Sequence, residues 1–241
     1  MLSRRGLFTF GVSRLVEGFD HSAPAAPVAP VDVDPRAPRR AWPRGDVGLW
    51  APVSACLPRP VGKLLDLDDL ELDLASLPFE DARFDGVLSA FGPMFSSDGR
   101  KAIDELFRVV RPGGTVAFTA WAPLGVVGRL LRLAATHDPL PRGVPPPLAW
   151  GREERLRQDL DCHSDDVRLH SRELMLCFDS GEQAVERLFE ALGPLAVAPR
   201  QDELRAQALA VVAELEEEGA GPMRLRARYL LAEAVRRPVL Y

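Results

Sequence analysis

The sequence has few cysteines, and their positions exclude the usual cysteine frameworks. Of 241 residues, three are cysteine, namely Cys56, Cys162 and Cys177, and no CxxC pair occurs. Thiols this far apart predict neither a disulfide framework nor a four-ligand zinc site. The pair Cys162-His163 has no further ligand nearby that would complete a site. We therefore expect no bound metal, and a reducing, cytoplasmic setting.

Long apolar runs and a basic excess are also missing. No run approaches the roughly 20 residues that a membrane helix needs. The net charge of −5 gives no overall field that would attract nucleic acid. The start Ser3-Arg4-Arg5 resembles a twin-arginine export signal, but Arg14 and Glu17 interrupt the apolar stretch behind it, so we do not expect export.

The N-terminal 23 residues predict a separate element, followed by a spacer. Residues 3–20 have the period of an amphipathic helix, and residues 24–41 are rich in proline and alanine, which is typical of an extended linker. Such a helix suits docking to a partner protein or to a membrane surface, and packing against its own domain stays open as the alternative. The predicted partner-binding residues are Leu7, Phe8, Val12, Leu15, Val16 and Phe19.

Residues 42–241 predict one α/β domain. Short β-rich segments alternate with helical periods, which favours a parallel sheet with crossover helices. The expected strands are 84–91, 115–121 and 168–178, and the alternation of 70–74 fits a short strand. The expected helices are 46–57, 97–110, 125–136, 153–160, 182–192 and 202–218. The period of 226–236 fits either a helix or a strand.

Two specific motifs carry a family resemblance. Residues 73–89 read DLASLPFEDARFDGVLS, and residues 105–114 read ELFRVVRPGG. Both resemble the class I S-adenosylmethionine-dependent methyltransferases, in their ubiquinone/menaquinone-biosynthesis-like branch. Residues 42–56 and 148–151 resemble the same family more weakly. The resemblance makes 226–236 the last strand of the sheet.

The resemblance implies a cofactor site that this sequence lacks in part. The family binds its cofactor with a glycine-rich turn after the first strand and an acidic residue after the second. The one Gly-x-Gly here, at 219–221, follows a predicted helix. Residues 63–67 fit a remnant of the first strand, yet Asp66 lies only seven positions before Asp73, too close for a crossover helix. We therefore predict a partial Rossmann-like methyltransferase sheet that lacks the first βαβαβ half, with flanking helices.

What survives of the implied pocket is small. By resemblance, Asp73, Ser89 and Phe91 are the vestigial cofactor-binding positions, and no catalytic residue is predicted. One or two hydrogen bonds contribute about 0.5–1.5 kcal/mol each, whereas micromolar binding needs about 8 kcal/mol.

The sequence therefore favours a non-catalytic interaction or scaffold subunit without a cofactor. A sheet that ends early exposes an edge, so we expect a protein partner or a homo-oligomer. Two alternatives stay open. One is an active methyltransferase that binds S-adenosylmethionine through a rebuilt or in-trans site, and the other is an accessory factor that residues 3–20 hold at a membrane surface.

Overall fold

A computed structural model describes residues 64–67, 73–96, 98–139, 146–192, 195, 198–217 and 222–238. The predicted N-terminal helix with its six apolar residues, the proline-rich spacer, the segment 42–56 and the Gly-x-Gly at 219–221 lie outside these residues. Among the described residues, no helix is long and apolar enough to cross a membrane.

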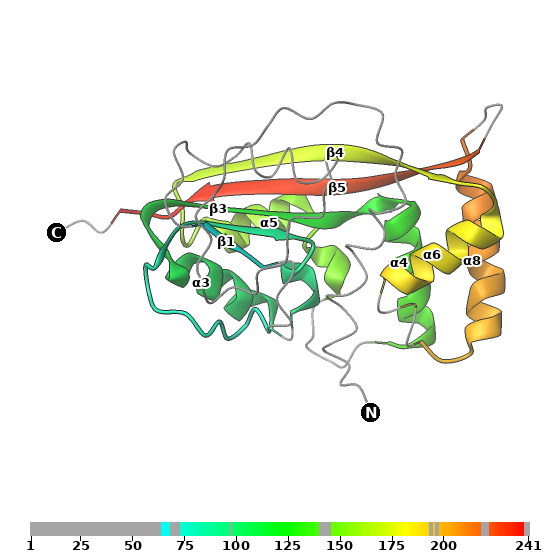
Figure 1. Ribbon diagram of the computed structural model, residues 1–241, viewed down its shortest axis with the longest axis horizontal. Coiled ribbons are helices and arrows are strands. Elements are labelled where there is room, and N and C mark those ends of the chain that lie inside the picture. The colour runs from blue at the N-terminus through cyan, green and yellow to red at the C-terminus, as the bar shows by residue number, and fades with distance from the viewer. Residues whose placement is uncertain are drawn as a thin grey trace.

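Within the described residues, a five-stranded sheet organises the fold (Figure 1). Its strands are β1 (Leu64–Asp66), β2 (Phe84–Ala90), β3 (Val110–Gly125), β4 (Asp166–Phe178) and β5 (Met223–Val235), in the spatial order β1-β2-β3-β5-β4. The α/β class with flanking helices is confirmed. The last segment is a strand, as the resemblance implies.

The expectation of a parallel sheet is wrong for one strand. β1, β2 and β3 run parallel, whereas β5 pairs antiparallel with both β3 and β4. The reason lies in the connection after β4. Two helices, α6 (Gly181–Ala191) and α8 (Gln201–Leu215), lead the chain out and back, so that Met223 pairs with Phe178 at the end where β4 finished. A single crossover helix, by contrast, returns the chain to the opposite end and gives a parallel neighbour.

The remaining helices begin at local capping signals or turns. α3 (Gly99–Val109) starts where the Asp98 carboxylate accepts hydrogen bonds from the backbone N–H groups of Arg100 and Lys101 at 3.1 and 3.2 Å. α4 (Val126–His137) and α5 (Glu153–Leu160) follow the third strand, and two short 3-10 turns, η1 (Pro93–Phe95) and η2 (Pro147–Ala149), precede α3 and α5. In Figure 1, α4, α6 and α8 gather at one end of the sheet.

The core follows the central strands. Residues 115–122 of β3 are all buried, so both faces of this strand are covered. From α3, Ile103, Leu106 and Phe107 complete the same core. The first residues of β3 need a glycine at one position, since Gly113 has a φ of +78°. The glycine pair read from the sequence therefore shapes the entry into β3.

Candidate functional site

The carboxyl end of β2 is the candidate site, because open α/β sheets bind ligands outside the carboxyl ends of their parallel strands. Two predicted residues lie there, Ser89 within the strand and Phe91 directly after it. Both side chains are buried, with 1% and 0% exposed. The Phe91 N–H donates to the backbone oxygen and the side-chain Oγ1 of Thr119, at 3.2 and 3.0 Å, which fixes the end of β2 to β3.

Aromatic rings fill the strand end. Phe91 stacks flat on Trp121 of β3, with ring centroids 3.8 Å apart and planes 6° from parallel. Tyr229 of β5 meets the Phe91 ring edge-on at 5.9 Å. Burial raises the pKa of Tyr229, against a smaller lowering by the charge of Arg172, so the phenol stays neutral near pH 7. These packed rings, which the sequence reasoning did not connect, form a small apolar core at the place where a ligand would enter.

Two features at this end are unusual. Phe91 adopts a φ of +63°, a left-handed conformation that bulky residues rarely take and that costs about 1–3 kcal/mol. The neighbouring Trp121 side chain is fully buried, and its Nε1 has no hydrogen-bond partner among the described residues. An unpaired buried donor carries a similar cost. Strain and an unpaired donor therefore coincide at the end of β2.

Asp73 reaches the same end of the sheet from the loop before β2. Its Oδ1 accepts hydrogen bonds from the Ser96 hydroxyl and the Ala75 N–H, both at 3.2 Å. A Cβ added at Gly92 would lie 2.5 Å from Ser89 Oγ and 3.3 Å from the Leu74 side chain, so this loop packs directly against the strand end. The structure thus brings Asp73, Ser89 and Phe91 together, while their role as cofactor-binding residues stays a prediction.

A charged clamp positions the loop that follows Asp73. The Arg108 guanidinium donates to the carbonyls of Leu77 and Phe79 at 3.0 and 2.7 Å, and to the carboxylate of Asp81 at 2.7 Å. Glu105 accepts from Arg108 and from the N–H of Leu77 at 2.7 Å. The hydrogen bond from Arg108 lowers the pKa of Glu105, and Glu105 in turn raises the pKa of Arg108. The clamp ties residues 77–81 to α3.

This clamp was missed as a feature of the site, although its signal was present. Both residues belong to the motif ELFRVVRPGG, which carries the family resemblance. An acid and a base three positions apart on a helix share one face, so they can act together on a neighbouring loop.

Histidines and cysteines supply no metal centre among the residues that the structure describes, where no group of three potential ligands occurs. His163 instead stacks on Phe107, with ring centroids 4.7 Å apart, and its Nε2 lies 3.0 Å from the Asp104 carboxylate. This places His163 in a structural contact between the turn after α5 and helix α3.

The sequence profile of the methyltransferase domain family matches residues 16–118, which confirms the resemblance over that segment. The matched segment begins within the predicted N-terminal helix and ends in β3. The domain boundaries predicted from composition stay a prediction.

Relatives by sequence match only part of the chain. An uncharacterized protein of Mycobacterium tuberculosis is 43% identical over 90 residues, which are 37% of this chain and 33% of that protein. The demethylmenaquinone methyltransferase of Thermus thermophilus is 42% identical over 59 residues, which are 24% of this chain and 27% of the enzyme. The match therefore spans about a third, or less, of the length of these relatives.

The solved structures share less sequence identity with this chain than these relatives do. The YcgJ protein of Bacillus subtilis superposes with a TM-score of 0.44 at 16% identity, over 69% of each chain. A methyltransferase-like protein of Bacillus halodurans has a TM-score of 0.43 at 13% identity, over 70% of this chain and 76% of that one.

Proposed function

We propose that this methyltransferase-like domain acts by binding a partner protein and that it does not hold S-adenosylmethionine. The observation that carries the proposal is the packing at the end of β2. Ser89 and Phe91, which the resemblance assigns to the cofactor pocket, are core residues, and the Phe91–Trp121 stack fills the strand end. A nucleoside cofactor needs open space and convergent polar groups at this point.

The first strand supports the same proposal. β1 has three residues and forms the border of the described sheet, directly beside β2. Residues 64–83 contain no glycine, so the sequence offers no position after β1 where the backbone could approach a cofactor without a Cβ in the way. The remaining candidate, Asp73, already accepts hydrogen bonds from Ser96 and Ala75.

A second candidate function is methyl transfer with a rebuilt site. The left-handed Phe91 and the unpaired Nε1 of Trp121 favour it, because strain and unsatisfied donors collect at functional sites. In this case, ligand binding would move the Phe91 ring and give the indole N–H an acceptor. A membrane-surface role has no support from the described residues.

Isothermal titration of the full chain with S-adenosylmethionine and S-adenosylhomocysteine separates the two candidates. The proposal predicts no heat of binding at a few hundred micromolar of either ligand. Stoichiometric binding that Asp73→Asn weakens, while Glu80→Gln leaves it unchanged, would establish a rebuilt site and contradict the proposal. Glu80 suits the control because it is exposed on the loop that follows.

A further inference from the structure

The outer edge of β4 is a border of the described sheet, without a further described strand beside it. β4 borders the sheet, and its thirteen residues pair with β5 from Asp166↔Val235 to Phe178↔Met223 without a register shift (Figure 1). It contains no proline. Long, regular edge strands of this kind accept an additional strand unless the protein blocks them.

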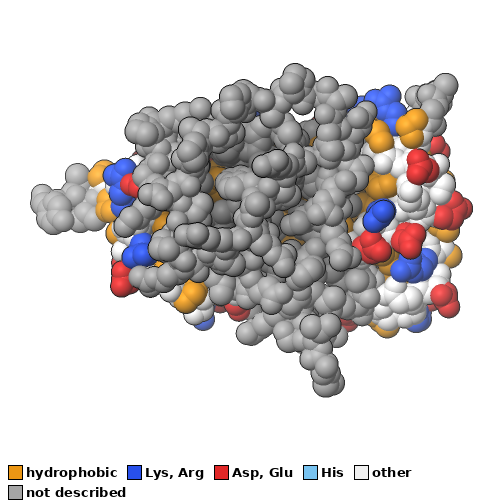
Figure 2. Space-filling model, viewed as in Figure 1, with side chains coloured by type: hydrophobic (Ala, Val, Ile, Leu, Met, Phe, Trp, Pro, Cys, Tyr) orange, Lys and Arg blue, Asp and Glu red, His pale blue; other side chains and the backbone are white. Residues whose placement is uncertain are grey.

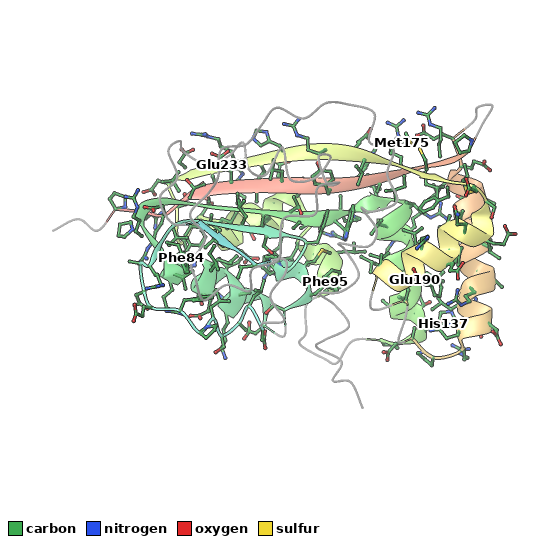
Figure 3. The ribbon with its side chains drawn as sticks, in the orientation of Figure 1. Phe84, Phe95, His137, Met175, Glu190 and Glu233 are labelled. Atoms are coloured by element: carbon green, nitrogen blue, oxygen red, sulfur yellow. The ribbon has the colours of Figure 1, made fainter. Side chains whose placement is uncertain are left out.

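The carbonyl of Val167 indicates which backbone groups of β4 point away from β5. Arg157 of α5 donates to the Val167 carbonyl at 3.2 Å, on the side of β4 away from β5. Residues of an antiparallel strand alternate between the two sides, so the N–H and C=O groups of Leu169, Ser171, Glu173, Met175 and Cys177 point the same way. Within the part of the chain that the structure describes, none of these outward groups has a backbone partner. Figure 3 shows Met175 toward the end of β4 near α6 and α8.

The side chains along this edge are basic on one face. Arg168, His170 and Arg172 alternate along β4 and therefore share a face. Arg168 is neutralised by Asp166 and Glu233, at 2.7 and 3.2 Å. Arg172 is exposed and forms no ion pair with the described residues. An incoming strand would thus meet, at the middle of the edge, a positive charge that no described residue neutralises.

We propose that the β4 edge, from Leu169 to Cys177, binds an extended acidic segment of a partner protein as a sixth strand. The backbone groups of the outward residues supply the ladder, and Arg172 selects carboxylates on one face of the added strand. The proposal specifies an acidic partner segment, and it rests on the proposed function of this domain in binding a partner protein.

A second copy of this chain would repeat the basic residues of this edge. Self-pairing centred on His170 sets Arg168 opposite Arg172, and self-pairing centred on Arg172 sets that residue opposite itself. Like charges directly opposite one another destabilise a strand pair. In these two registers, charge complementarity therefore favours an acidic partner over a homodimer.

Fluorescence anisotropy of the full chain with a labelled nine-residue peptide of alternating glutamate and valine tests the proposal. Binding is expected, and the peptide with lysine in place of glutamate should not bind. Ser171→Pro should abolish binding, because it removes an outward N–H but no bond to β5, whereas Ser171→Ala should bind as the native chain does. Arg172→Glu should weaken binding at least about fivefold. A thermal melt verifies that each variant is folded.

Equal binding of the two peptides, or unchanged binding by a folded Ser171→Pro variant, would overturn the proposal. Light scattering that shows a dimer which Ser171→Pro converts to a monomer would also overturn it, in favour of a second copy. The same preparation is titrated with S-adenosylmethionine. Cofactor binding together with peptide binding would refute the proposed function and leave the β4 edge intact, and the absence of both would refute the edge alone.

Discussion

Within the described residues, the two borders of the sheet differ sharply. At one border, β1 contributes three residues that pair with Gly86, Val87 and Leu88 of β2. At the other, β4 and β5 pair along thirteen consecutive positions. In the class I resemblance the short border is where the cofactor half would continue, and the long border belongs to the last strands. The comparison indicates that the longest regular strand pairing of the described sheet is the antiparallel pair of β4 and β5.

Ion pairs at the two ends of the domain differ in their exposure. In the space-filling view, acidic and basic side chains are interspersed at the end where α4, α6 and α8 lie (Figure 2). One such pair is Arg129 with Glu214, which joins α4 to α8 through two hydrogen bonds of 2.7 Å. On the β1–β2 side, the comparable ion pair is Glu105 with Arg108, and it is less exposed. We expect the two pairs to differ in their contribution to stability.

The largest loss of stability is expected on β3, which joins the parallel strands to the antiparallel strands. Trp121→Ala should lower the free energy of unfolding by about 3–5 kcal/mol, because it removes a fully buried ring stacked on Phe91. Urea denaturation followed by circular dichroism measures this. The control Leu124→Ala, at a side chain 59% exposed on the same strand, should change it by less than about 0.5 kcal/mol. Similar losses in both variants would mean that the strand end is not packed.

The contacts of Arg108 with Glu105 and with the loop allow a stability test on the β1–β2 side of the sheet. Arg108→Ala should cost about 1–3 kcal/mol, since it removes the hydrogen bonds that Arg108 donates to the Glu105 carboxylate and to two loop carbonyls. The matched change Arg129→Ala should cost less than about 1 kcal/mol, because Glu214 is 62% exposed and solvent replaces the bond. Chemical denaturation of both variants under one condition gives the comparison. A larger loss in Arg129→Ala would reverse the ranking of the two sides.

The turn into β3 should show a smaller loss. Gly113→Ala should destabilise the protein by about 1 kcal/mol through backbone strain alone, because φ is +78° and nothing lies within 4 Å of the added Cβ. Gly113→Asn should lose less, since asparagine tolerates the left-handed region better. Thermal denaturation distinguishes the two. An equal loss in both variants would indicate a steric cause.

The smallest effect is expected in how the stability of the protein depends on acidic pH. The pKa of Glu105 is lowered in the folded state, first by its hydrogen bond from Arg108, so its contribution is present above the unfolded pKa, near 4.5, and is lost as the pH falls through the lower folded value. Glu105→Gln should therefore make the stability less dependent on pH below about 4.5. Denaturation midpoints at pH 6 and pH 3.5 measure the slope. An unchanged slope would show that other carboxylates dominate the acid response.

The sequence predicted most elements but not their directions. The strands at 84–91 and 168–178 and the helices around them follow from hydrophobic periods, which report on one segment at a time. The antiparallel direction of β5 depends on α6 and α8 acting as a pair, and no period encodes how two helices pack. This is why the sheet is mixed where a parallel sheet was expected.

The candidate site was predictable in position only. The resemblance led to Asp73, Ser89 and Phe91, and the structure places all three at one strand end. The stack of Phe91 on Trp121, and the contact of both with Tyr229, join residues up to 138 positions apart and leave no local signal. Whether a strand end is open or filled depends on such contacts, so the sequence left that question to the structure.

Hydrogen–deuterium exchange of the full chain, with and without saturating S-adenosylhomocysteine, tests the central claim most directly. A packed strand end that holds no cofactor predicts identical exchange at residues 86–96 and 117–123 in both samples. Slower exchange in these two segments when the ligand is present would show that the end of β2 opens to a cofactor, and it would contradict the claim that this domain works by binding a partner protein alone.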